Sequence, residues 1–235
     1  MLLIAHRGYS GKAPENTMAA FRMALAAGAK ALELDVHQTK DGRLAVLHDW
    51  NLKRVAGKRR RVAAMTWSEL GAVDVGGWFS PRFHGERVPL LEEILDLARG
   101  RAQVHVELKA GSGKYPGIEE RAARILDERG AWDWTMVSSF DHAALKRVRK
   151  ISPKARIGYL LGPALLPMVW RETAALRAES LNVSVRQATA RRVRSAHERG
   201  LKIFVYTVND AKTLARMRRL GVDGVYTNFP EMKAA

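Results

Sequence analysis

Ionisable side chains stand at or near the ends of several apolar segments that have the length of β-strands. Burying an ionised group in a strand costs several kcal/mol unless the group is paired or bound to a metal. Repetition of such positions along one chain therefore indicates a functional site. The residues concerned are His6, Arg7, Glu33, Asp35, His48, Glu107 and Lys109.

Together these side chains have the chemistry that a phosphate ester needs. Carboxylate oxygens suit hard divalent cations such as Mg²⁺ or Ca²⁺ better than Zn²⁺. Arginine presents a planar fork to two phosphate oxygens, and lysine presents a point charge. Histidine, with an unperturbed pKa of about 6.5, serves as a general acid or a general base near neutral pH. We therefore expect metal-assisted chemistry on a phosphate.

Short apolar segments alternate with amphipathic helical patterns from one end of the chain to the other. This alternation is typical of parallel βα units. Eight such units in 235 residues predict an α/β fold, a (β/α)8 TIM barrel formed by a single domain, residues 1–235. The active site of this fold lies at the C-terminal ends of the strands. The expected strands are 2–6, 31–36, 104–108, 135–139, 156–161, 180–185, 202–207 and 224–227. The expected helices are 17–27, 91–98, 118–129, 142–150, 188–199 and 211–220.

A hairpin is expected directly after the second strand, because Asp41-Gly42 is a strong signal for a two-residue turn. With those two residues as the turn, Asp35 lies opposite His48. Directly opposed residues point to the same face of a hairpin, and alternation places Glu33 on that face as well. The hairpin is thus expected to bring one histidine and two carboxylates together, although a slip of one residue would break the grouping.

The segment from Trp50 to Pro89 interrupts the alternation of strands and helices. We interpret it as a small insertion after the hairpin strand that folds over the mouth of the barrel. Its aromatic residues Trp78, Phe79 and Phe83 fit two alternatives. They form a wall of the substrate pocket, or they form a small hydrophobic core of the insertion itself.

The chain carries a formal net charge of +16. Such an excess attracts polyanions and raises the association rate of anionic substrates. The densest basic run is residues 53–61, which is either a solvated loop or a contact for a phosphorylated ligand. No zinc-finger spacing and no aromatic-glycine RNA-binding motif accompany this run. We therefore expect a small-molecule substrate and no nucleic-acid partner.

Apolar residues make up 47% of the chain, which is enough for a full core. No apolar stretch is long enough to span a bilayer, so we expect no stable membrane insertion. The first residues lead directly into a strand and do not have the pattern of a signal peptide, which favours a cytoplasmic location. The absence of cysteine excludes disulfides and thiolate metal sites. The oligomeric state is left open.

Ordered motifs extend over nearly the whole chain. They are His6-Arg7-Gly8, Pro14-Glu15-Asn16-Thr17, Glu33-Leu34-Asp35-Val36, Lys40-Asp41-Gly42, His48-Asp49, Trp78-Phe79, Val106-Glu107-Leu108-Lys109, Tyr115-Pro116-Gly117, Ser138-Ser139-Phe140, Tyr206-Thr207-Val208-Asn209 and the run from Gly221 to Pro230. This series resembles the glycerophosphodiester phosphodiesterase family. A lone His-Arg-Gly is weak evidence, whereas the ordered series is highly specific.

The resemblance implies a metal-dependent barrel enzyme that hydrolyses glycerophosphodiesters to glycerol 3-phosphate and an alcohol. It also implies that the attacking group is the glycerol 2-hydroxyl of the substrate, which gives a cyclic phosphate that water then opens. The implied cofactor is a divalent metal, Mg²⁺ or Ca²⁺. By this resemblance the metal ligands are Glu33, Asp35 and Glu107, the catalytic acid and base are His6 and His48, and the phosphate-binding residues are Arg7 and Lys109.

Other residues carry alternatives. Tyr206 is expected to bind substrate in the glycerol pocket, with ordinary packing in the barrel as the alternative. His105 shares the face of Glu107 and either supports the site or is structural. A lysophospholipase D would need an apolar groove beside the mouth, for which residues 165–170 offer side chains, although a helix on the outer ring explains them as well. The remaining histidines are expected in solvent or on helix faces, and they are His37, His84, His142 and His197.

Overall fold

The computed structural model describes residues 1–111, 113–162 and 168–233. In these ranges the strands are β1 (Leu2–His6), β2 (Ala31–Gln38), β3 (Leu44–Val46), β4 (Gln103–Leu108), β5 (Thr135–Ser139), β6 (Arg156–Leu160), β7 (Ser180–Ser184), β8 (Lys202–Tyr206) and β9 (Gly224–Thr227). The α-helices are α1 (Met18–Ala26), α2 (Lys53–Ala56), α3 (Trp67–Gly71), α4 (Leu91–Ala98), α5 (Ile118–Glu128), α6 (His142–Ile151), α7 (Val169–Ala175), α8 (Ala190–His197) and α9 (Ala211–Leu220). Two short 3₁₀ helices, η1 (Val62–Ala64) and η2 (Pro81–Phe83), lie between α2 and α4.

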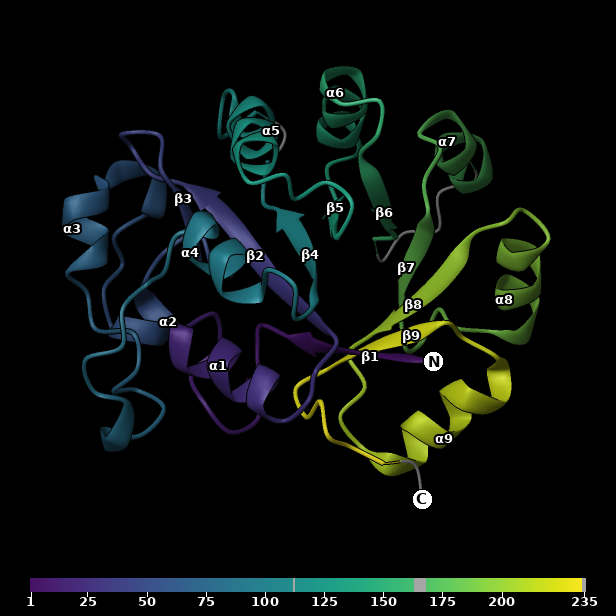
Figure 1. Cartoon of the computed structure of the whole chain (residues 1–235), viewed down its shortest axis with the longest axis horizontal. Helices are drawn as coiled ribbons and strands as arrows, with labels where there is room; N and C mark the ends of the chain where they lie inside the picture. Colours follow the sequence, from purple (N-terminus) through teal and green to yellow (C-terminus); the bar gives the residue numbers. More distant parts are fainter. Residues whose placement is uncertain (112, 163–167, 234–235) are drawn as a thin grey trace.

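Eight parallel strands close into a barrel, which confirms the predicted fold. β1 pairs in parallel with β9 on one side and with β2 on the other. The pairs that join β2 through β4, β5, β6, β7 and β8 to β9 are parallel as well. Figure 1 shows the strands grouped at the centre of the molecule with helices around them. This is a (β/α)8 TIM barrel, in which the C-terminal strand ends form the functional face.

The interior of the barrel is filled by side chains rather than open. Neutral polar side chains form one group among them. The Asn182 amide donates to the Tyr226 hydroxyl at 3.0 Å, and His105 Nδ1 lies 3.1 Å from the same oxygen. Ser180 donates to the Asn182 carbonyl oxygen at 2.8 Å. The surrounding apolar residues are Ile4, Ala31, Met136, Phe204 and Tyr226.

Local signals at the helix ends explain why several helices begin and end within two residues of the predicted bounds. The side chains of Thr17 and Asp210 each accept a hydrogen bond from the backbone N–H three residues further on, as N-caps do. After α9, Gly221 takes a left-handed φ of 76°, which suits a residue without a Cβ atom at a helix C-terminus. These signals depend only on neighbouring residues and are therefore readable from sequence.

The β2–β3 hairpin has a three-residue loop, where the sequence predicts a two-residue turn. The Thr39 N–H donates to the Arg43 carbonyl at 2.9 Å, and residues 40–42 form the loop between them. Gly42 takes a left-handed φ of 83°, as the last position of such a loop requires. The Thr39 hydroxyl fixes this arrangement, because it accepts from the Arg43 N–H at 2.9 Å and donates to the Asp41 carboxylate.

The longer loop shifts the strand pairing by one residue. Val46 lies opposite Val36, and the Leu47 N–H donates to the Asp35 carbonyl at 3.0 Å. The prediction that Asp35 lies opposite His48 is therefore wrong. His48 follows the last paired residue of β3 and reaches the mouth of the barrel from that position.

The chain between β3 and α4 builds a hydrophobic cluster of its own against the outer side of the hairpin. Its buried residues are Ala45, Leu47, Leu52, Val55, Val62, Met65, Leu70, Val73, Val75 and Val88. Phe79 and Phe83 pack in a separate small cluster with Ala13 and Ala20, and Trp78 is 44% exposed. Among the residues that the structure describes, none of these three aromatic side chains lines the central cavity.

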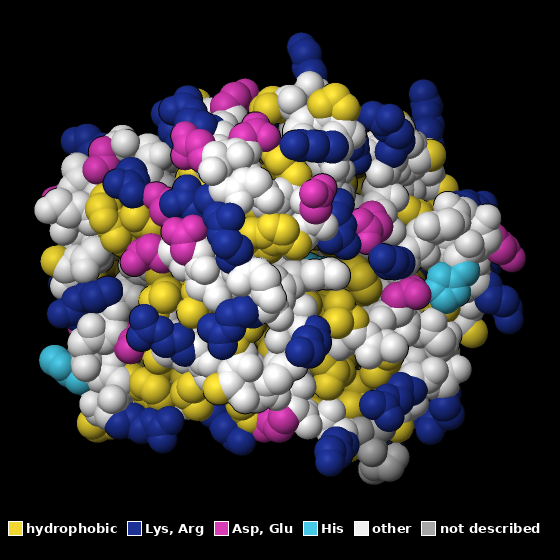
Figure 2. All heavy atoms as spheres, viewed as in Figure 1, with side chains coloured by type: hydrophobic (Ala, Val, Ile, Leu, Met, Phe, Trp, Pro, Cys, Tyr) yellow, Lys and Arg dark blue, Asp and Glu magenta, His cyan; other side chains and the backbone are white. Residues whose placement is uncertain are grey.

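Three further features concern the surface. No helix within the described ranges is both long enough and apolar enough to cross a membrane. Of the apolar residues at 165–170, Val169 and Trp170 begin α7, Met168 is exposed, and 165–167 lie outside the described residues. Figure 2 shows Lys and Arg side chains spread over the visible face rather than gathered in one patch.

Candidate active site

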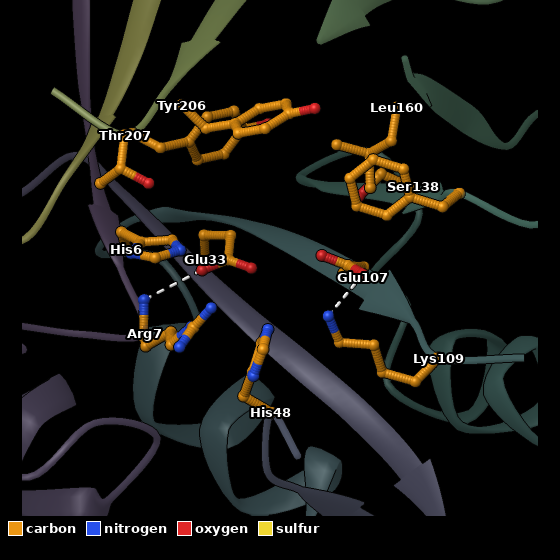
Figure 3. A pocket seen from close by; sticks show the side chains of 12 residues that line it. His6, Arg7, Glu33, His48, Glu107, Lys109, Ser138, Leu160, Tyr206 and Thr207 are labelled. Atoms are coloured by element: carbon orange, nitrogen blue, oxygen red, sulfur yellow. Dashed lines mark hydrogen bonds and ion pairs between the residues drawn. The ribbon is translucent and has the colours of Figure 1, made fainter. Parts of the chain in front are cut away.

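One cavity of about 210 Å³ opens at the C-terminal ends of the strands. β1 ends at His6, β2 carries Glu33, β4 carries Glu107, and β8 ends at Tyr206. Figure 3 shows the two carboxylates between Tyr206 on one side and His48 on the other. The residues that line the cavity are His6, Arg7, Glu33, His48, Glu107, Lys109, Ser138, Phe140, Leu160, Tyr206, Thr207 and Tyr226.

Arg7 is held in place by the turn that follows β1. Its backbone and that of Asn16 have left-handed φ values of 58° and 56°, a conformation that persists in such residues only when surrounding contacts hold it. The Arg7 N–H donates to Glu33 Oε2 at 2.9 Å. The guanidinium lies 3.2 Å from Asp35 Oδ2 and donates to Glu15 at 3.0 Å. The turn thus places the guanidinium beside the carboxylates of Asp35 and Glu15 and the backbone N–H against that of Glu33.

Three carboxylates gather on the floor of the cavity. Glu33, Asp35 and Glu107 each offer an oxygen, and these atoms lie within 4.8 Å of one another. The Lys109 ammonium lies 2.8 Å from Asp35 Oδ1 and donates to Glu107 Oε1 at 2.6 Å. Glu33 is 5% exposed and accepts from a backbone N–H, but within the described part of the chain it has no lysine or arginine side chain in ion-pair distance. The cluster therefore holds more negative charge than its paired cations neutralise.

Burial and mutual repulsion separate the pKa values of these carboxyl groups. Burial raises the pKa of Glu33 well above its usual range, and the charge of Asp35 raises it further. Burial also raises the pKa of Glu107 to about 7, against the opposing effect of Lys109. Burial alone would raise the pKa of Asp35 too, but Lys109 and Arg7 hold it far below its usual value. Glu33 and Glu107 thus bind protons more readily than free carboxyl groups do when no metal cation is near.

The two histidines of the cavity have different hydrogen-bond partners. His6 Nδ1 lies 2.8 Å from the side-chain oxygen of Asn228, and burial, with the nearby Arg7, lowers the pKa of His6 to about 4. His48 Nδ1 lies 2.7 Å from the Asp49 carboxylate. Burial lowers the pKa of His48, while carboxylates, Asp35 most strongly, act in the opposite direction. The His6 imidazole is therefore held by a neutral amide, and the His48 imidazole is held by a carboxylate.

An ion-pair network that the sequence did not reveal supports the rim of the cavity. Arg54 donates to both carboxylate oxygens of Glu15, each at 2.7 Å, and to Asp49 at 2.8 Å. Glu15 in turn accepts from Arg7, and Asp49 accepts from His48. Arg54 belongs to the basic run at 53–61, which offers no local signal to distinguish it from its neighbours.

His37 is buried, so the prediction that it lies in solvent or on a helix face is wrong. Its Nε2 lies 2.9 Å from the backbone oxygen of His48, and its Nδ1 lies 2.9 Å from the Tyr115 hydroxyl. The Trp50 ring contacts it edge-on at 4.8 Å between centroids. His37 therefore fixes the backbone of His48, and two aromatic side chains from other segments bury it.

The structure brings all eight predicted site residues together. Seven of them line the cavity, and Asp35 lies beneath it in contact with Arg7 and Lys109. Tyr206 lines the cavity and donates from its hydroxyl to the Leu161 carbonyl at 2.8 Å, and its contact with substrate stays a prediction. His105 lies in the barrel interior and does not line this cavity. Sequence reasoning left out Ser138, Phe140, Leu160 and Thr207 as wall residues and Asn228 as the partner of His6.

Comparisons with known proteins agree over the whole barrel. The model of the glycerophosphoryl diester phosphodiesterase family matches residues 6–232. A glycerophosphodiester phosphodiesterase from Caldanaerobacter subterraneus is 37% identical over 231 residues, which are 98% of this chain and 95% of that protein. One from Bacillus subtilis is 31% identical over 252 residues, with 99% and 85% covered.

Comparison with solved structures identifies relatives of the same family. A phosphodiesterase from Oleispira antarctica, in complex with the product sn-glycerol-3-phosphate, matches with a TM-score of 0.92 and 27% identity over 98% of this chain and 94% of that one. A glycerophosphoryl diester phosphodiesterase from Silicibacter pomeroyi matches with a TM-score of 0.89 and 30% identity, with 98% and 90% covered. This chain belongs to the glycerophosphoryl diester phosphodiesterase family of hydrolases.

Proposed function

We propose that this enzyme hydrolyses glycerophosphodiesters to glycerol 3-phosphate and an alcohol, with residues 1–235 as a single catalytic domain and residues 50–89 as an insertion over the mouth of the barrel. The observation that carries the proposal is the convergence of two histidines, three carboxylates, one arginine and one lysine at the barrel mouth. Family membership supports the reaction class. The product bound to the Oleispira antarctica relative supports the glycerol phosphate half of the substrate.

The carboxylate cluster fits a divalent cation. Its donors are all oxygens, their ligand atoms lie within 4.8 Å of one another, and Glu33 is buried without an ion-pair partner among the described residues. Glu33, Asp35 and Glu107 would hold the cation, and an all-oxygen set favours Mg²⁺ or Ca²⁺. When bound, such a cation neutralises phosphate charge and makes the phosphorus more open to attack.

Arg7 and Lys109 are the groups that we expect to hold the phosphate. Both line the cavity, and both contact Asp35 from opposite oxygens of its carboxylate. That shared carboxylate orients the two cations toward the same space. A guanidinium offers two parallel donors to phosphate oxygens, and an ammonium offers a compact charge.

The hydrogen-bond partners of the histidines support a division of their roles. With its Nδ1–H donated to Asn228, His6 presents an unprotonated Nε2, which suits a general base. His48 has the Asp49 carboxylate as its partner, which stabilises an imidazolium and suits a general acid. We infer that His6 takes the proton of the attacking hydroxyl, the glycerol 2-hydroxyl of the substrate, and that His48 protonates the leaving alkoxide.

The test is the release of glycerol 3-phosphate from glycerophosphocholine in the presence of Mg²⁺ or Ca²⁺. His48→Ala is expected to lower kcat by about 10²–10⁴-fold with an unchanged circular dichroism spectrum. His84→Ala, at a histidine of the neighbouring segment that is 81% exposed, is the matched control and keeps full activity. Full activity in His48→Ala would exclude the proposed acid.

The route through the substrate hydroxyl has a separate test. Bis(p-nitrophenyl) phosphate lacks a neighbouring hydroxyl, so we expect it to be a poor substrate compared with glycerophosphocholine. Comparable turnover of the two diesters would contradict this route and would favour direct attack by water.

Nucleic acid is not expected to be a partner despite the net charge of +16. The Lys and Arg side chains are spread over the face seen in Figure 2, whereas a nucleic-acid surface concentrates them along a groove or stripe. Filter binding of DNA at several salt concentrations checks this expectation. A steep fall of log affinity with log salt would contradict it.

A further inference from the structure

A second pocket, of about 570 Å³, opens on the outer side of the active site. It shares His48 and Lys109 with the central cavity. In Figure 3 these two residues lie on the opposite side of Glu33 and Glu107 from Tyr206. A phosphodiester held at the shared residues therefore directs one substituent into the central cavity and the other into the outer pocket. The outer pocket is lined by His48, Asp49, Trp50, Asn51, Lys53, Arg54 and Lys109.

The outer pocket carries positive charge that neighbouring carboxylates do not neutralise. Asp49 is already engaged by His48 at 2.7 Å and by Arg54 at 2.8 Å. Lys53 is exposed at the wall of the pocket, and Lys114 lies close by with its ammonium 4.5 Å from the Trp50 ring centroid. In the part of the chain that the structure describes, neither ammonium has a carboxylate in ion-pair distance. Two cations thus face solvent beside the place where the second substituent leaves.

Trp50 does not form an aromatic cage for a cationic head group. Its ring stacks on Tyr115 with 5.4 Å between centroids and 11° between planes, and the Lys114 ammonium lies over it. Recognition of a quaternary ammonium uses open aromatic faces. Here the indole already contacts one aromatic ring and one cation, and the Lys114 ammonium repels a choline-like group that approaches it.

We propose that the outer pocket binds the alcohol part of the substrate and selects alcohols that carry a phosphate or carboxylate over those that carry a quaternary ammonium. This selection rests on the proposed function, because it names the substrate class of the same active site. The unpaired ammonium groups attract an anion and repel a cation across a few ångströms of water. At low ionic strength we expect kcat/KM for an anionic alcohol group to exceed that for choline by about five- to tenfold.

The experiment compares three glycerophosphodiesters whose alcohols are choline, glycerol and glycerol phosphate, which are cationic, neutral and anionic. Loss of the diester signal in ³¹P NMR at saturating Mg²⁺ gives kcat/KM for each. We expect the order anion, neutral, cation at low salt. The differences in kcat/KM between the three diesters should shrink at 0.5 M salt, where the screening length is roughly 4 Å. A choline ester that is hydrolysed fastest at low salt would overturn the proposal.

Charge-reversal variants test whether Lys53 and Lys114 cause the selectivity for anionic alcohols. Lys53→Glu and Lys114→Glu are each expected to lower the anion-to-choline ratio of kcat/KM by about threefold or more. Lys30→Glu is the matched control, because Lys30 is an exposed lysine that directly precedes β2 at the opposite end of the barrel and changes the net charge equally. It should leave the ratio and the activity unchanged. If the anion-to-choline ratio of kcat/KM is the same in Lys53→Glu and Lys114→Glu as in Lys30→Glu, the proposal is overturned.

A binding measurement separates this proposal from the proposed function. Titration calorimetry of the same three diesters into the His6→Ala variant gives the order of Kd without turnover, and His6 does not line the outer pocket. A wild-type enzyme that hydrolyses none of the three would refute the proposed function. Tighter binding of the anionic diester would still support the selection, and equal binding or no binding of all three would refute it.

Discussion

Two groups of buried polar side chains lie two residues apart along β4. The inner group contains His105, which is 1% exposed and shares the Tyr226 hydroxyl with Asn182. Burial lowers the pKa of His105 to about 3, so this group is neutral. The outer group contains Glu107, whose pKa burial raises to about 7 beside the cations and carboxylates of the mouth. One layer of the barrel thus has neutral hydrogen bonds, and the next has an excess of buried charge.

This contrast in charge distinguishes a structural polar group from a functional one. A neutral group of buried hydrogen bonds contributes to folding, because removing the partner of one of its members costs free energy. A cluster of carboxylates that lacks enough cations costs stability in the empty enzyme and gains it only when a ligand supplies charge. A substitution at the mouth should therefore lower activity without lowering stability. A substitution in the inner layer should lower stability and leave activity nearly unchanged.

The largest effect is expected for Glu33→Gln at the mouth. The amide keeps the shape and the acceptor for the Arg7 N–H but removes the buried charge. We expect divalent metal affinity and kcat each to fall by about 100-fold or more. The metal-free variant should be more stable than the wild type at pH 8 by about 1–3 kcal/mol, because an unpaired buried carboxylate is lost. Metal titration calorimetry, kinetics and urea unfolding measure these quantities.

Glu128→Gln is the control for this substitution, since the Glu128 side chain on α5 is 58% exposed. It should change none of the three quantities. A Glu33→Gln variant that retains activity, or that is less stable than the wild type without metal, would contradict the view of the mouth as a cluster with excess charge.

A change in the inner layer should produce the reverse pattern. His105→Ala leaves a cavity and removes a partner of the Tyr226 hydroxyl, so we expect the free energy of unfolding to fall by about 2–4 kcal/mol. Activity at a temperature where the variant remains folded should stay within a few-fold of the wild type. A 100-fold loss of kcat with unchanged stability would mean that His105 acts in catalysis.

The last effect that we predict is the pH dependence of stability without metal, in which opposing groups partly cancel. Burial lowers the pKa of His6 and His37 to about 4 and that of His105 to about 3, and it lowers the pKa of His48 as well. Between pH 6.5 and about 4 the unfolded chain therefore binds more protons at these histidines than the folded protein does. Stability should fall as the pH falls through this window.

The raised pKa of Glu33 and that of Glu107 oppose this trend, because those two groups bind protons in the folded protein first. The histidines all act in one direction over this window, and we expect the net change to keep their sign. Urea unfolding in EDTA at several pH values measures it, and the slope should be shallower in His105→Gln. Stability that rises between pH 6.5 and 4.5 would show that the glutamates dominate.

The strands and most helices could be predicted because their signals are local. Apolar runs of strand length and capping residues such as Thr17 and Asp210 act on their immediate neighbours. The hairpin register could not be predicted, because Asp41-Gly42 fits a two-residue turn and also the end of a three-residue loop. The hydrogen bonds of Thr39 decide between the two, and they form only in the folded hairpin.

The predicted site residues come from strand ends, whose side chains the barrel must bring to one face. The parts that were missed depend on contacts between distant segments. Arg54 reaches Glu15 across 39 positions of sequence, and nothing in the basic run marks it. His37 has the same strand alternation as Asp35, but its burial depends on Trp50 and Tyr115, which arrive from other segments.

We propose above all that the carboxylates at the mouth hold a divalent cation which the reaction requires. The most direct test is glycerol 3-phosphate release from glycerophosphocholine by enzyme treated with EDTA, before and after addition of Mg²⁺ or Ca²⁺. We predict loss of activity to background and its recovery with one or both ions in the wild type, but not in Glu33→Gln. Undiminished release by the metal-free enzyme would contradict the claim.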